Sequence, residues 1–241
     1  MKKMGLFDAF KKKNAAPLPA LMKRGKTEEQ CKCIDFFFSK DDEKGGKKKK
    51  KGCFGSGEMT MDEYCALVQK KVDSLGLKER AIAKIGLDES QISEIPPVAL
   101  ASFLFRSDCT IFTKSEETNI GGVYKHVSNI YQITWIFFSS TQLYTYTYQF
   151  DMISDNVVET TKDFFYTDIT CIKTTHEVEE FIIEKKSGCF GKVKYQHQNK
   201  HWDSLRVTVP GEDYAFFTRT TDTIEQSIQA AKAMIRERKG A

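Results

Sequence analysis

The sequence predicts an α+β protein: a strongly bent antiparallel β-barrel or sandwich capped by a C-terminal helix. A small helical arm and a basic, disordered N-terminus are expected to precede it. Three observations predict this class. Residues 98–218 alternate apolar and polar side chains between turn signals, as half-buried strands do. Residues 222–238 repeat apolar residues at helical spacing, and residues 1–57 have a low-complexity, lysine-rich composition.

The first predicted segment, residues 1–57, is distinguished by its charge. It carries 16 Lys/Arg and 7 Asp/Glu, a net charge of +9, whereas residues 58–241 carry 21 and 26, a net charge of −5. A nucleic-acid-binding domain is basic over its folded part, so no specific nucleic-acid partner is expected. Prolines, paired glycines and the run "DDEKGGKKKKK" predict disorder. Within the segment, "CIDFFFSK" is an apolar island that packs on the fold or forms a brief strand.

The second predicted segment, residues 58–97, is a helical arm. Thr60 and Glu63 form a capping box, and apolar residues recur at helical spacing until Gly76. A second helix, "LKERAIAKIG", ends at Gly86, because glycine readily takes the left-handed conformation that ends helices. A short third helical turn, "DESQISEI", is expected before the two prolines at 96–97.

The third predicted segment, residues 98–241, is the β domain with its closing helix. In "QITWIFFSSTQLYTYTYQFD" the period of two is clear, and "SST" reads as the turn of a long antiparallel hairpin. Tyr144, Tyr146, Tyr148 and Phe150 are expected on one face. Further strands are expected in "DFFYTDITCIKT", "EVEEFIIEK", "KVKYQHQ", "SLRVTVP" and "DYAFFT". A capping box at Asp222 opens the final amphipathic helix, which would cover an exposed sheet edge.

The β region resembles pleckstrin-homology-like domains of the bacterial type, related in outline to the GRAM and bacterial PH groups. The resemblance rests on the long hairpin, on "FFYTDITCI" and on the closing helix, and it spans roughly residues 98–239. It implies a non-catalytic binding or scaffolding module that in some members is oligomeric through strand edges. Classical members bind phosphoinositides through basic residues in the first strand–strand loop. Here that region offers Lys114 and Lys125 but also Glu116 and Glu117, so no site residues are carried over.

No motif in the sequence predicts catalysis, a cofactor or a metal. His197 and His201 have the spacing of a zinc-binding helix, but Gln198 replaces the glutamate base and the stretch reads as a hairpin loop. The cysteines at 31, 33, 53 and 65 lack the two close pairs of a zinc ribbon. Glycine-rich phosphate loops are absent from the sequence. We therefore expect a protein that is not an enzyme.

The cysteine pattern and the hydropathy limit the cellular compartments in which the protein is expected. The seven cysteines are scattered and odd in number, which favours a reducing compartment. No apolar run approaches the roughly 18 residues of a membrane span. These features predict a cytoplasmic protein, located at the inner membrane surface if its basic segment binds lipid.

Two function classes remain open. If residues 4–13 form a helix, Phe7 and Phe10 lie on one side while Lys11, Lys12 and Lys13 crowd its end. Such a segment could bury its rings in an anionic membrane surface, each nearby lysine adding about 1 kcal/mol. A second electrostatic contact would come from Lys47, Lys48, Lys49, Lys50 and Lys51. Alternatively, residues 4–13 form a solvated tail or a short helix docked on the fold. The second function class is then a module that binds a protein partner or assembles into a homo-oligomer and does not bind lipid.

Overall fold

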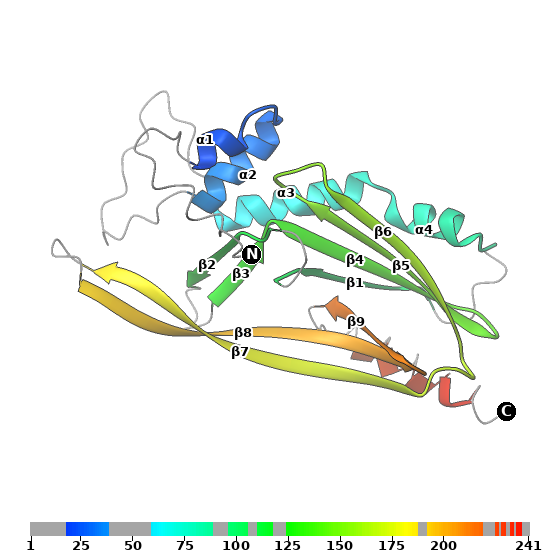
Figure 1. The fold of residues 1–241 in the computed structure, drawn as a ribbon. Coiled ribbons are helices and arrows are strands. Elements are labelled where there is room, and N and C mark those ends of the chain that lie inside the picture. Colours follow the sequence, from blue (N-terminus) through cyan, green and yellow to red (C-terminus); the bar gives the residue numbers. More distant parts are fainter. Residues whose placement is uncertain are drawn as a thin grey trace, which may run out of the picture.

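The computed structural model describes residues 18–38, 59–88, 96–105, 110–117, 124–187, 192–218 and parts of 225–237 (Figure 1). The described chain is mixed α+β, and its strands form three antiparallel sheets. The sheet orders are β1-β4-β5-β6, β2-β3 and β7-β8-β9. The mixed class predicted from the sequence is therefore confirmed.

Residues 18–22 and 28–38 are helical, which corrects the prediction that residues 1–57 are mostly disordered and contain no helix in this part. Helix α1 spans Leu18–Met22 and helix α2 spans Glu28–Phe38. A capping box precedes α2: the Thr27 hydroxyl accepts from the Gln30 amide at 3.2 Å, and the Gln30 side chain accepts from the Thr27 amide at 3.0 Å. The pattern T-x-x-Q is the local sequence signal for this helix, which was not predicted.

Helix α2 belongs to the folded core. Its residues Cys33, Ile34 and Phe36 are buried. The Phe36 ring stacks on Tyr64 with centroids 4.6 Å apart. The apolar island "CIDFFFSK" thus packs on the fold as predicted, but its described part, residues 33–38, is helical instead of a strand.

Helices α3, Met61–Ser74, and α4, Leu77–Ile85, confirm the predicted arm. The Thr60–Glu63 capping box opens α3 through both of its reciprocal hydrogen bonds. Gly76 and Gly86 have φ of 53° and 75°, the left-handed conformation that favours glycine. The expected third turn falls almost entirely on residues 89–95, outside the described part.

The four-stranded sheet is the central layer. It contains β1 (Val98–Phe103), β4 (Ile130–Phe138), β5 (Gln142–Asp151) and β6 (Val157–Phe165). The β4–β5 hairpin has the predicted position and pairs Phe138 with Leu143. Helices α3 and α4 lie along one side of this sheet, and the β7-β8-β9 sheet lies on the other (Figure 1).

Two hydrophobic cores lie on the two faces of this sheet, because neighbouring strand residues point to opposite sides. Toward the helices, the predicted aromatic face of β5 packs with α2, α3 and α4, and Tyr146, Tyr148 and Phe150 are buried there. Toward the second sheet, the buried residues are Val98, Leu100, Ile136, Phe138, Leu143 and Phe164. Strand β5, whose alternating pattern predicts one buried and one exposed face, is thus covered on both faces.

The second sheet contains β7 (Cys171–Ser187), β8 (Lys192–Val209) and β9 (Glu212–Thr218). The strand boundaries predicted from the sequence for this region differ from the observed ones. "KVKYQHQ" and "SLRVTVP" are parts of the single strand β8, so His197 and His201 lie in a strand and not in a hairpin loop. "DFFYTDITCIKT" is interrupted by a turn in which the Asp168 amide donates to the Phe165 carbonyl at 3.0 Å.

The described strands form no closed barrel, which corrects the barrel alternative. The small sheet of β2 (Thr113–Glu117) and β3 (Tyr124–Ser128) is separate from the other two. β6 is the last strand of the four-stranded sheet, and β7 is the first strand of the three-stranded sheet. The turn after Phe165 leads the chain from one sheet to the other, so β6 and β7 do not pair with each other. The two larger sheets pack as separate layers and do not join into one closed sheet.

The predicted C-terminal helix is described only in part. The described residues between 225 and 237 are helical, and Ile228 and Ile235 are buried in the core between the sheets. A continuous helix over 222–238 stays a prediction. Among the described helices, none combines the length and the apolar character that a membrane crossing requires.

Candidate functional site

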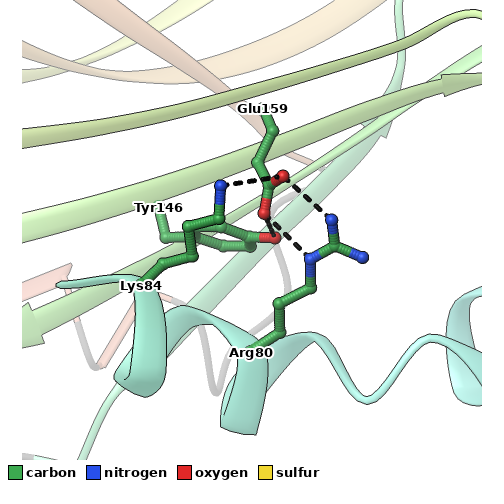
Figure 2. Close-up of polar contacts among 4 residues, drawn as sticks. All are labelled: Arg80, Lys84, Tyr146 and Glu159. Carbon is green, nitrogen blue, oxygen red and sulfur yellow. Dashed lines mark hydrogen bonds and ion pairs between the residues drawn. The ribbon is translucent and has the colours of Figure 1, made fainter. Parts of the chain in front are cut away.

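Ionisable side chains cluster where helix α4 crosses strand β6. Arg80 and Lys84 are four residues apart, so they share one face of α4. That face lies over Glu159 of β6 and Tyr146 of β5, and all four side chains converge (Figure 2). Tyr146 faces the helices because β5 places alternate residues on that side.

Glu159 is the centre of this cluster. Its carboxylate accepts two parallel hydrogen bonds from Arg80, each 2.9 Å, and lies 3.3 Å from the Lys84 ammonium. The Tyr146 hydroxyl donates to the same carboxylate at 2.5 Å. The Arg80 hydrogen bonds lower the pKa of Glu159 to about 2, whereas burial and the bond to Glu159 raise the pKa of Tyr146.

The cluster is suited to holding α4 on the sheet and unsuited to proton transfer. A general base needs a pKa near the working pH and a free lone pair aimed at a substrate. Glu159 is ionised well below neutral pH and already accepts from three side chains. Arg80 also lies over the Tyr148 ring, 5.1 Å from its centroid. We conclude that these residues form a latch between helix and sheet.

A second polar cluster surrounds Asp151 at the end of β5, and it too is occupied internally. The Asp151 carboxylate accepts from the Asn129 side chain at 2.8 Å, the Ile153 amide at 3.0 Å and the Ser154 hydroxyl at 2.6 Å. Those partners fix the turn between β5 and β6. Asp151 therefore has a structural role in this arrangement.

The two lysines of the β2–β3 region, Lys114 and Lys125, contact helices. Lys114 donates to the Phe36 carbonyl at 3.0 Å, at the C-terminal end of α2, where cations are favoured. Lys125 forms an ion pair with Asp62 of α3 at 2.7 Å, and this hydrogen bond raises the Lys125 pKa. These contacts tie the β2–β3 sheet to α2 and α3.

Two clefts lie next to the second sheet. The smaller one, about 70 Å³, lies between the end of β1 and Arg206, whose guanidinium pairs with Glu177 at 2.7 Å and Asp213 at 3.1 Å. The larger one, about 190 Å³, lies between the central sheet and β9. Gln132, Thr145, Thr147, Thr160, Lys162, Tyr214, Ala215 and Phe216 line it. None of these described lining residues is acidic.

Strand β6 has an outer edge that no described strand pairs with. Three large apolar side chains near this edge are exposed: Val157 at 48%, Val158 at 49% and Phe165 at 55%. An edge strand with exposed apolar residues is a typical site for pairing with another strand.

The residues predicted to contact a membrane are not among those described: Phe7, Phe10, Lys11, Lys12, Lys13, Lys47, Lys48, Lys49, Lys50 and Lys51. Cys53 lies outside as well, whereas Cys33 is buried and Cys31 and Cys65 are half-buried on their helices. Within the described part of the chain, no three His, Cys, Asp or Glu side chains gather as a metal site would require.

Neither the latch nor the larger cleft was predicted from the sequence. The spacing of Arg80 and Lys84 is visible in the sequence, but their partner Glu159 is about 80 residues away along the chain. Lys162 likewise reads as an ordinary exposed strand residue. No protein-family model, curated protein or solved structure matches the chain.

Proposed function

We propose that the protein is a non-catalytic binding or scaffold protein with a PH-like β domain, attached peripherally to anionic membrane surfaces through its basic N-terminal region. One observation carries this proposal: the net charge is +9 over residues 1–57 and −5 over the remainder. A cationic segment joined to an acidic body favours contact with an anionic surface through that segment alone.

The position of α1 and α2 strengthens this arrangement. They divide the basic region into residues 1–17 and 39–57, each with a net charge of +4. Because α2 packs into the core, both basic stretches are tethered to the same part of the fold. Two tethered contacts bind a surface more tightly than either one alone.

Sedimentation with vesicles tests the proposal. The variants change Lys11, Lys12 and Lys13 to Gln, Lys47–Lys51 to Gln, or both sets, and the vesicles are phosphatidylcholine with or without phosphatidylserine. At about 1 kcal/mol per lysine, the triple variant should lose about 3 kcal/mol, or roughly a hundredfold in partitioning. Deleting residues 1–57 is unsuitable, because it removes α2 and its buried side chains.

The matched control changes three exposed lysines of the folded part, Lys70, Lys78 and Lys173, to Gln. It alters the net charge of the protein by the same amount as the triple variant. Binding should require phosphatidylserine, fall with salt and persist in this control. Equal sedimentation of wild type and the combined variant would exclude lipid attachment through the basic region.

A second candidate, self-assembly, is favoured by the exposed edge of β6. Pairing of this edge with the β6 edge of a second copy would bury Val158 and Phe165 and satisfy backbone groups left unpaired among the described strands. The double variant Val158→Lys/Phe165→Lys places charges there, with Leu21→Lys on α1 as an exposed control. Light scattering should show a mass that rises with concentration for wild type and control, but not for the double variant. A monomeric wild type at all concentrations would contradict this candidate.

A further inference from the structure

The face of the central sheet that points to the second sheet changes character along its length. Near the β4–β5 turn it is apolar, with Phe138, Leu143 and Phe164 at one register position across three strands. Farther along, Thr134, Thr147 and Thr160 occupy the corresponding position. The hydroxyls of Thr134 and Thr147 are hydrogen-bonded to each other at 3.0 Å, and Thr160 is exposed, so this polar row runs from the buried interior to the solvent at the edge of the sheet.

The larger cleft lies over this polar part. Thr147 and Thr160 line it, together with Thr145, the Gln132 side chain and Lys162. β9 supplies the opposite wall. The Thr145 hydroxyl donates to the Lys162 carbonyl at 3.3 Å, and the hydroxyls of Thr147 and Thr134 are hydrogen-bonded at 3.0 Å. The Thr160 hydroxyl, the Gln132 amide and the Lys162 ammonium can donate hydrogen bonds into the cleft, and Thr147 can do so when Thr134 donates to it.

Among the described residues of this lining, Lys162 is the only charged one. Its ammonium lies 3.6 Å from the centroid of the Tyr214 ring, and it forms no ion pair with the described carboxylates. Arg206 in the smaller cleft offers a contrast, because two carboxylates neutralise it. The described lining of the larger cleft therefore carries one positive charge and no carboxylate.

The size of the cleft restricts the ligand. Its volume of about 190 Å³ leaves room for several water molecules. Pockets for drug-sized ligands span about 300–1,000 Å³. A small tetrahedral or planar oxyanion fits both this volume and a lining of one cation and several neutral donors.

We propose that the cleft between β9 and the central sheet binds a small free oxyanion of the phosphate class, with Lys162 as its charged partner. The hydroxyls of Thr147 and Thr160 and the Gln132 amide surround the same space and supply neutral donors. This site is separate from the basic N-terminal region, and it does not depend on membrane attachment.

An NMR titration of the full chain with inorganic phosphate tests the proposal. Amide signals of residues 145–147, 160–162 and 214–216 should shift along one saturable curve. Sodium chloride at matched ionic strength should not reproduce these shifts. Shifts that never saturate, that scatter over the surface, or that chloride reproduces would overturn the proposal.

Variants then connect the binding to Lys162. Lys162→Met should weaken phosphate binding at least about tenfold, whereas Lys78→Met, an equal change of charge on the helix side of the sheet, should leave it unchanged. Thr160→Val keeps the shape of an exposed edge residue and should weaken binding several-fold through the lost hydroxyl. Unchanged affinity in both Lys162→Met and Thr160→Val would refute the site, as would an equal loss in Lys78→Met.

Discussion

The latch centred on Glu159 gives the most specific prediction, the effect of Glu159→Gln on stability. The folded-state pKa of Glu159 is lowered from 4.5 to about 2 by its partners. This difference corresponds to a ceiling of roughly 3 kcal/mol in favour of the folded state. The Arg80 and Lys84 side chains are 42% and 54% exposed, so solvent screens part of that energy. We expect Glu159→Gln to lower the free energy of unfolding by about 1–2 kcal/mol at neutral pH.

The sign of the pH dependence follows from the lowered pKa. The carboxylate stabilises the fold fully above the unfolded-state pKa near 4.5, and this contribution is lost as pH falls toward the folded-state value of about 2. At about pH 3, less than about half of the stability difference between wild type and Glu159→Gln should remain. The variant itself should respond less to acid over this range than the wild type does.

Urea denaturation followed by circular dichroism, at about pH 7, 4.5 and 3, measures these differences. Asp163→Asn is the matched control, because Asp163 lies on the same face of β6 and makes no ion pair with any described residue. This control should change stability by less than about 0.5 kcal/mol. A difference between wild type and Glu159→Gln that stays constant from pH 7 to pH 3 would show that the ionised latch contributes nothing.

Three further predictions concern the helices and the cysteines. Thr60→Ala removes the cap of α3 and should lower the free energy of unfolding by about 1 kcal/mol, measured by urea denaturation; no change would mean that the capping box is not formed. Phe36→Ala should cost about 3–5 kcal/mol in the same assay, and a loss below about 1 kcal/mol would place α2 outside the core. Burial raises the pKa of Cys33 to about 12, so a thiol reagent should label exposed Cys171 rapidly and Cys33 only after unfolding. Mass spectrometry after brief labelling checks this, and equal labelling of both cysteines would contradict the buried position of Cys33.

Helices α3 and α4 and the β4–β5 hairpin could be predicted because their signals are local. A capping box joins residues three apart, a helix-ending glycine acts on the turn beside it, and the strand period is visible within ten residues. Helix α2 has the same kind of local signal, the capping box of Thr27 and Gln30, so it could have been predicted as well. The strand boundaries after Phe165 were harder to predict, because the apolar residues Tyr166 and Ile169 resemble strand residues although Tyr166 lies in the turn and Ile169 directly follows it.

The amino-acid sequence by itself determined the mixed class, the two arm helices, the central hairpin and the separation of positive charge from the acidic remainder. Only the tertiary structure decided that α2 joins the core, that the sheets form no closed barrel, and that Glu159 contacts Arg80 whereas Lys162 lies in a cleft whose described lining has no carboxylate. The physical reason is range. Caps and periodicity act between near neighbours in the chain, whereas the partner of a charged side chain depends on which distant strands and helices are packed beside it.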